Sequence, residues 1–374
     1  MKKSEVNEIR KQFDHDRCTI SRICGCYIDG EKSIKTVFTD SFLTLPEEET
    51  FKYFEIFKKT LSGTVGKNLL DIDFPRDDSF ENSQNDFLIQ LKNSELRDDK
   101  LNMRLYEEVI KSFNYAGNYL VLLVYMAYDV PGISNDNLTL EDASDEVYKC
   151  VLCSICPVEL SKAGLSYQPD ENKISHRKQD WVVGMPLNGF LFPAFNERSA
   201  DVNSILYYSK NPKVLQDELI ENLLGCEAPL TAELQKDVFT DIIAETLGDD
   251  CDYETVRSIN EKLGQMVEES KEELRPPTID VAELKSVLVE SGVSGEKIES
   301  LDQKCSENQE LAKRELHLSN LVNTRSFEVS TPSISIKVDP DSTHLLETKL
   351  VDGRKSIVIP ITDEVEVNGV PVKI

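Results

Sequence analysis

The 374-residue chain has one tryptophan and only four histidines, His15, His176, His317 and His344, which lie far apart in the sequence. Few histidines leave few side chains that can act as a general base near neutral pH. The sequence also lacks a Gly-x-Ser-x-Gly elbow and a His-Glu-x-x-His zinc motif. It therefore contains no complete catalytic pattern of these enzyme classes, and it does not by itself reveal an activity.

Long apolar stretches are also missing. The longest apolar run is "YLVLLVYMAY" at 119–128, whereas a membrane-spanning helix needs roughly 20 apolar residues. The first residues, "MKKSEVNEIRKQFDHDR", contain no apolar segment like that of a secretory signal. Nine cysteines without such a signal indicate thiols kept in a reducing compartment. We therefore expect a cytoplasmic protein without a membrane partner.

Positive charge is scarce, because 68 acidic residues face 42 basic ones and the net charge is −26. A phosphate backbone is repelled by such a surface unless basic residues are concentrated in one patch. The densest basic stretch, "KISHRKQD" at 173–180, is flanked by Asp170 and Glu171 and itself contains Asp180. The charge therefore disfavours nucleic acid as a partner.

The apolar patterns of residues 1–210 predict an α+β domain with a mixed, largely antiparallel sheet and covering helices. A β-hairpin is predicted around Asp29-Gly30, and two doubly apolar runs are typical of central strands that are covered on both faces. The predicted segments are helices at 4–12, 46–63 and 98–115, a short strand within 82–96, and central strands at 117–130 and 147–158.

Residues 211–275 are predicted to form an acidic helical region. Between 227 and 275 the chain has 14 acidic and 5 basic residues, which suit the outward faces of helices without any partner. Residues 276–374 begin with Pro276 and are predicted to contain a helix pair followed by a small all-β segment. The expected turns of that segment are Asp352-Gly353 and Asn368-Gly369.

The run "CVLCSICPVEL" at 150–160 raises the question of a metal site, because its cysteines are spaced like those of a ferredoxin. Pro157 follows Cys156 directly, so the fourth ligand of that pattern is missing. On a strand, Cys150 and Cys156 point to one face and Cys153 to the other. We therefore predict that the three thiols are core residues and not ligands.

A second group, Cys18, Cys24 and Cys26, lies in even register with Ile20 on a predicted strand, and His15 is close in sequence. A zinc site with three cysteines and one histidine is conceivable there. However, Cys24-Gly25-Cys26 lacks the two-to-four-residue spacing of a structural zinc knuckle. The sequence therefore favours an inward-facing strand, with no metal and no cofactor.

Polar residues gather in "FPAFNERSAD" at 192–201, where an apolar segment ends. Ligands often bind where a strand ends and a helix begins, so Asn196, Glu197, Arg198 and Asp201 are the candidate ligand-binding residues. Helix capping by Ser199 or Asp201 and a surface Arg–Glu pair explain the same residues without a ligand.

Several segments together resemble a known family: "ISRICGCYIDGEK", "EIFKKTLSGTVGKNLL", "EDASDEVYKCVLCSICPV", "FLFPAFNERSADVNSILYYSKN" and "EVNGVPVKI". They are similar to an uncharacterised family of about this length, described only as a domain of unknown function, from low-GC Gram-positive bacteria. The resemblance covers most of the chain and implies no catalytic or binding residue. The order of the predicted elements is also similar to that of bacterial nucleoid-associated proteins.

The sequence thus leads to three functional hypotheses. The first is a non-enzymatic interaction or scaffold protein that binds a protein partner or a second copy of itself. The second, which rests on the resemblance in layout, is a nucleoid-associated or nucleic-acid-related accessory protein. The third is an enzyme of unknown class with its site near Asn196–Asp201.

Overall fold

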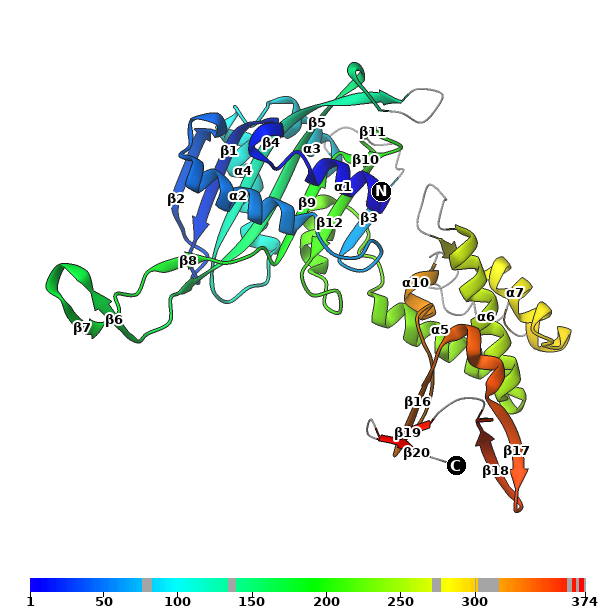
Figure 1. The fold of residues 1–374 in the computed structure, drawn as a ribbon. Coiled ribbons are helices and arrows are strands. Elements are labelled where there is room, and N and C mark those ends of the chain that lie inside the picture. Colours follow the sequence, from blue (N-terminus) through cyan, green and yellow to red (C-terminus); the bar gives the residue numbers. More distant parts are fainter. Residues whose placement is uncertain are drawn as a thin grey trace. The chain divides into compact units, whose positions relative to one another are not determined.

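The computed structural model describes residues 1–75, 83–133, 139–270, 277–299, 301, 316–361, 365–367 and 370–372. The chain forms two compact units, unit 1 (Met1–Ala232) and unit 2 (Glu233–Ile374) (Figure 1). The domain boundary expected near residue 275 falls within 271–276, outside the described residues. The division of the chain into three parts stays a prediction.

Unit 1 contains one large sheet with the strand order β2-β1-β4-β5-β9-β12-β3, and β8 pairs with the end of β5. All described ladders of this sheet are antiparallel. The strands are β1 (Ile20–Ile28), β2 (Ile34–Ser41), β3 (Leu69–Asp73), β4 (Asn118–Ile133), β5 (Thr139–Leu160), β8 (Trp181–Val183), β9 (Asn188–Phe192) and β12 (Ser204–Ser209). The predicted α+β class and largely antiparallel sheet are confirmed.

Helices cover both faces of this sheet (Figure 1). Apolar side chains of α1 (Lys3–Arg10) and α2 (Glu47–Thr60) form a core cluster on one face. Those of α3 (Gln84–Asn93), α4 (Asp99–Ser112) and the π-helix η4 (Leu219–Leu224) form a second cluster on the other face. The central strands β4 and β5 contribute to both clusters, which explains why their sequences are apolar at nearly every position.

The hairpin predicted around Asp29-Gly30 is confirmed by the pairing of β1 with β2. The Asp29 carboxylate organises the turn, because its Oδ1 accepts hydrogen bonds from the backbone N–H groups of Glu31 (3.0 Å) and Ser33 (2.9 Å). Across the turn, the Gly30 N–H donates to the side-chain oxygen of Asn118 in β4 (2.8 Å).

The strand predicted within 82–96 is wrong, because these residues form helix α3. Ser83 caps the helix by accepting a hydrogen bond from the backbone N–H of Asp86 at 3.2 Å. Phe87, Leu88 and Leu91 then lie on one helical face and enter the core. The helical spacing of these three side chains and the cap outweigh the short apolar run that suggested a strand.

Unit 2 contains helices and small β-hairpins. Its helices are α5 (Ala232–Leu247), α6 (Tyr253–Glu269), α7 (Val281–Glu290), the short α10 (Leu318–Leu321) and the 3-10 helix η7 (Pro340–Leu345). Asp252 caps α6, since its Oδ1 accepts a hydrogen bond from the Thr255 N–H at 2.8 Å. Residues 295–299 form the beginning of the second helix of the predicted pair.

The predicted all-β segment is confirmed as antiparallel hairpins. They are β15 (Phe327–Thr331) with β16 (Ile334–Val338), β17 (Glu347–Val351) with β18 (Arg354–Val358), and β19 (Val365–Val367) with β20 (Val370–Val372). Asp352 and Gly353 both have positive φ, which suits a tight two-residue turn. Asn368-Gly369 lies outside the described residues. None of the helices in the described part of the chain has the length and apolar composition needed to cross a membrane.

Candidate functional site

The three cysteines of β5 are core residues, as predicted. Cys150 and Cys156 belong to the cluster under α1 and α2, and Cys153 belongs to the cluster on the opposite face. Burial raises the pKa of the Cys150 and Cys156 thiols to about 12, and it raises that of Cys153 even further. Because the thiolate is both the nucleophile and the metal ligand, these protonated thiols suit neither role.

The structure does not bring the other zinc candidates together. Cys24 and Cys26 face α4, whereas Cys18 is half-buried and packs against the cluster on the other face. An irregularity in register after Ile20 separates the two halves of the segment, so the even spacing predicted from the sequence does not keep one face. His15 is exposed beside Asp16. Within the described ranges, no three His, Cys, Asp or Glu side chains are placed to hold a metal ion.

The candidate residues Asn196–Asp201 form a tight hairpin in which β10 (Ala194–Asn196) pairs with β11 (Ser199–Asp201). Glu197 and Arg198 occupy its two-residue turn with φ values of +54° and +59°. The expected helix after this segment is absent, so Asp201 caps no helix here. The polar residues are instead at a turn between two short strands.

The side chain of Arg198 binds helix α1. Its guanidinium donates to both carboxylate oxygens of Glu8, at 3.2 and 2.9 Å, and to the backbone oxygen of Pro131 at 2.9 Å. The Tyr128 hydroxyl donates to the same carboxylate at 2.9 Å. The Glu8 carboxylate accordingly raises the pKa of Arg198. These contacts tie α1 to the hairpin, which is a structural role.

Asn196 and Asp201 belong to a second chain of hydrogen bonds. The Asn196 amide donates to Asp201 (2.9 Å) and to the Ser204 hydroxyl (3.1 Å), and that hydroxyl donates to Asp71 (2.8 Å). The Met1 amino group also binds the Asp71 carboxylate. The polar atoms thus satisfy one another across β3, β10, β11 and β12. The ligand-binding role of Asn196, Glu197, Arg198 and Asp201 stays a prediction.

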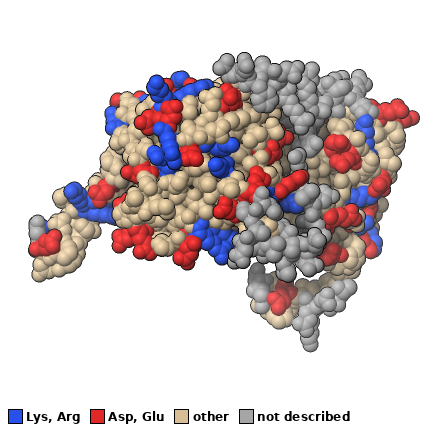
Figure 2. Space-filling view, turned by 90° about the horizontal axis from the view of Figure 1, so that it is seen from above, with Lys and Arg blue, Asp and Glu red and all other residues tan. Residues whose placement is uncertain are grey.

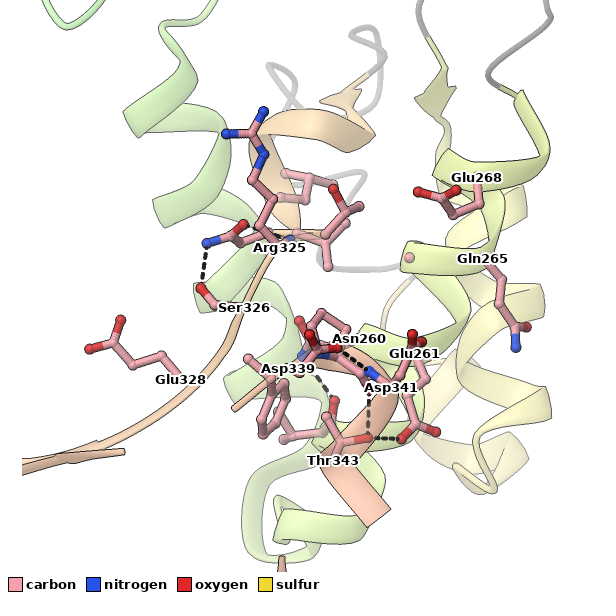
Figure 3. A pocket seen from close by; sticks show the side chains of 18 of the residues that line it. Asn260, Glu261, Gln265, Glu268, Arg325, Ser326, Glu328, Asp339, Asp341 and Thr343 are labelled. Atoms are coloured by element: carbon pink, nitrogen blue, oxygen red, sulfur yellow. Dashed lines mark hydrogen bonds between the residues drawn. The ribbon is translucent and has the colours of Figure 1, made fainter. Parts of the chain in front are cut away.

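A pocket of about 1080 Å³ lies within unit 2 (Figure 3). Its walls come from α6, the segment 321–328 and η7, which are far apart in the sequence. The Thr343 hydroxyl donates to Glu261 Oε1 at 2.7 Å and also contacts the Pro340 carbonyl at 3.1 Å. Asp339 caps η7 by accepting from the Asp341 N–H at 3.0 Å. Two of the carboxylates at this end of the pocket are therefore engaged in the fold.

Further charged groups line the same pocket. Arg325 and Glu328 lie on the 321–328 side, whereas Gln265 and Glu268 lie on α6 (Figure 3). Glu328 accepts from the Ser335 hydroxyl at 2.7 Å, which lowers the pKa of its carboxyl. The lining can offer hydrogen-bond donors and acceptors to a polar molecule. Sequence patterns did not single out these residues, because the pocket depends on the packing of three separate segments.

A second feature, in unit 1, is an arm that we define as residues 160–183. Its strands β6 (Leu165–Gln168) and β7 (Lys173–His176) form a two-stranded ribbon that projects from the sheet (Figure 1). The Tyr167 hydroxyl donates to the Asn172 side chain at 2.8 Å and so holds the turn. At the base, the Ser161 N–H donates to the Asp180 carbonyl at 2.8 Å.

The arm exposes many apolar side chains. Leu165 is 77% exposed, Ile174 69% and Tyr167 60%, and Trp181, the only tryptophan of the chain, is 59% exposed. Leu160, Val182 and Val183 are exposed as well. Figure 2 shows the arm as a projection with basic and acidic side chains nearer the sheet and an acidic side chain at its end. An isolated two-stranded ribbon is at best marginally stable in water, and this one leaves its apolar side chains in contact with solvent.

Comparison with known proteins assigns the chain. A family model described as "Domain of unknown function (DUF4317)" matches residues 1–370. The chain belongs to this family. The predicted resemblance to a domain of unknown function is thereby confirmed, whereas the bacterial source stays an expectation. No curated protein matches the chain. For this DUF4317 protein, function must therefore be argued from its own surfaces.

Proposed function

We propose that this DUF4317 protein is an interaction protein that binds a protein partner through its arm. The proposal rests on one observation, which is that Leu165, Tyr167, Ile174 and Trp181 are each at least 59% exposed on a ribbon that projects from the sheet. Burying such side chains in a partner removes apolar surface from water. Tryptophan and tyrosine are also enriched among the residues that contribute most to protein binding.

The strand pairing at the base of the arm supports this proposal. β8 pairs with β5 in antiparallel register. Trp181 lies opposite Leu160, Val182 opposite Glu159, and Val183 opposite Val158. Among the described strands, β8 has no second neighbour, so its other edge presents backbone N–H and C=O groups. A partner can add a strand at such an edge while its side chains contact the exposed apolar residues.

Site-specific photo-crosslinking tests the proposal. A photoreactive phenylalanine analogue in place of Tyr167 should give a discrete crosslinked product in the cells that naturally produce the protein. The same analogue at Lys100, an exposed residue of α4 in the same unit, is the control. If the analogue at Tyr167 gives no more crosslinked product than the analogue at Lys100, the proposal is contradicted.

A second candidate function is nucleic-acid binding, because a two-stranded ribbon fits the major groove of DNA and the densest basic stretch of the chain lies on this ribbon. Two observations oppose it. The net charge is −26, and the turn at the end of the ribbon contains Asp170, which would meet phosphates first. A gel shift with duplex DNA at low salt separates the two functions, since the protein-binding proposal predicts no shift at micromolar protein.

A further inference from the structure

The cleft between α1, η1 (His15–Arg17) and α2 in unit 1 concentrates positive charge. It has a volume of about 700 Å³ and is lined by Asn7, Arg10, Lys11, Asp14, Asp16, Arg17 and Lys58. Four of these seven residues are basic and two are acidic, whereas the whole chain has more acidic than basic residues. Three separate elements thus bring cations to one cleft of an acidic protein.

We infer that this cleft binds a small dianionic ligand with a phosphate group. The four cations and two carboxylates of the lining leave two positive charges, which match a phosphate dianion. A guanidinium binds phosphate through two parallel hydrogen bonds, and Arg10 and Arg17 are both present. The volume suits a small phosphorylated molecule, since pockets for such ligands measure roughly 300–1,000 Å³.

The bonding of these side chains inside the protein supports the inference. Arg10, Lys11, Arg17 and Lys58 take part in none of the ion pairs found among the described residues. Arg10 Nε is buried and has no hydrogen-bond partner in the structure, and its Nη1 makes only a long contact of 3.5 Å with Asn7. The Arg10 guanidinium is therefore held only by a long contact within its own helix, and its other N–H groups are able to bind an acceptor in the cleft.

The two aspartates of the cleft are occupied elsewhere. Asp14 caps η1, because its Oδ1 accepts a hydrogen bond from the Asp16 N–H at 3.2 Å. Asp16 lies 3.5 Å from the ring of His15 on the same turn. Arg10 and Lys58 are in the last turns of α1 and α2, where cations also stabilise the helix dipoles. That role does not apply to Arg17, which contributes a positive charge from a different element.

Binding of inorganic phosphate and pyrophosphate to the full chain, measured by isothermal titration calorimetry at constant ionic strength, tests the inference. The pocket variant combines Arg17→Gln with Lys58→Gln. Its matched control combines Lys3→Gln with Lys59→Gln, which removes the same charge from α1 and α2 at exposed positions outside the lining. We expect saturable binding that is at least tenfold weaker in the pocket variant and unchanged in the control.

Two results overturn the inference. One is the absence of saturable binding of either anion to the unaltered protein. The other is an equal loss of affinity in the pocket variant and in the control, which would mean that any surface cation attracts the anion. Circular dichroism of both variants establishes that they are folded, so a difference between them reports on the cleft. The arm of unit 1 is unchanged in both variants, and the inference is therefore independent of the proposed function.

Discussion

At the scale of single residues, burial decides which cysteines of this protein can react. Of the cysteines within the described residues, Cys251 is exposed and Cys18 is partly exposed, whereas six are buried: Cys24, Cys26, Cys150, Cys153, Cys156 and Cys226. Burial raises the pKa of Cys26 to about 11 and that of Cys226 to about 12. At pH 8 a thiol with a pKa near 12 is ionised in only about one molecule in 10,000.

We therefore predict that iodoacetamide at pH 8 modifies Cys251 first, Cys18 more slowly, and the six buried cysteines only after unfolding. Mass spectrometry of peptides taken at successive times measures the order. The fully denatured protein, in which every thiol reacts, serves as the reference. Modification of Cys153 as fast as Cys251 in the folded protein would contradict the burial of β5.

The same pKa shifts predict a loss of stability at alkaline pH. The folded state keeps buried thiols such as Cys150 and Cys156 protonated to about pH 12, whereas the unfolded chain releases these protons near pH 9. The unfolded state thus binds fewer protons above pH 9, so the free energy of unfolding falls as the pH rises. The melting temperature should decrease by several degrees between pH 8 and pH 10. A melting temperature that stays constant over that pH range would contradict the raised pKa values of the buried thiols.

The Glu8–Arg198 ion pair leads to a prediction about stability. Both side chains are about three-quarters buried, with 23% and 26% of their surface exposed. Replacing Arg198 with alanine leaves the Glu8 carboxylate partly buried with only the Tyr128 hydroxyl as a partner. We expect the free energy of unfolding to fall by about 2 kcal/mol. Urea unfolding measures this change, and Arg177→Ala on the exposed arm is the control.

A double-mutant cycle with Glu8→Ala separates the pair from other effects. If the two side chains stabilise the fold through their contact, the double variant loses less free energy of unfolding than the two single variants lose together. Strictly additive losses would show that the contact contributes nothing. The sequence suggested a surface Arg–Glu pair within the segment 196–201, whereas the observed partner, Glu8, lies 190 residues away in α1 and the pair is largely buried. Such a contact depends on the packing of α1 against the sheet.

At the scale of elements, Gly189 decides how closely α2 approaches strand β9. A Cβ atom at this position would lie 2.4 Å from the backbone oxygen of Cys153 and 2.6 Å from Thr60 Cγ2. The Thr60 hydroxyl also binds Ser154 at 2.7 Å, which fixes the helix against β5. Only a residue without a side chain fits this contact.

Gly189→Ala should therefore lower the free energy of unfolding by about 2 kcal/mol or more, because strand and helix must separate to admit the methyl group. Gly164→Ala is the matched control, since nothing lies within 4 Å of a Cβ atom there. Thermal unfolding followed by circular dichroism compares the two variants. Equal melting temperatures of the two variants would show that the sheet accommodates a methyl group at position 189 without losing stability.

Local patterns predicted some elements well and others badly. The central strands and the Asp29 turn follow from short segments whose signals agree with the fold. Helix α3 was not predicted, because the apolar run after its cap, Ser83, also fits the pattern of a short strand. The face of Cys18 was wrong because an irregularity in β1 changes the alternation, and periodicity alone does not reveal such an irregularity.

At the scale of the whole molecule, the pocket of unit 2 and the cleft of unit 1 could not be predicted. Each is lined by residues from separate elements, and no single segment contains a recognisable motif. The arm is a different case. Its basic residues are visible in the sequence, but its two strands and the exposure of their side chains were not predicted. A strand pattern predicts a ribbon without indicating whether that ribbon packs on the body of the protein.

The two core clusters of unit 1 contain no residue between 161 and 183, so the arm should be dispensable for stability. Ser161 and Asp180 already meet in backbone hydrogen bonding, so a short Gly-Ser loop can replace residues 162–179 at little entropic cost. We expect this variant to keep its circular dichroism spectrum and to melt within about 2 °C of the unaltered protein. Loss of cooperative unfolding would assign the arm to the fold. Preserved cooperative unfolding would show that the arm does not stabilise the fold, as the proposed binding role of its exposed side chains requires.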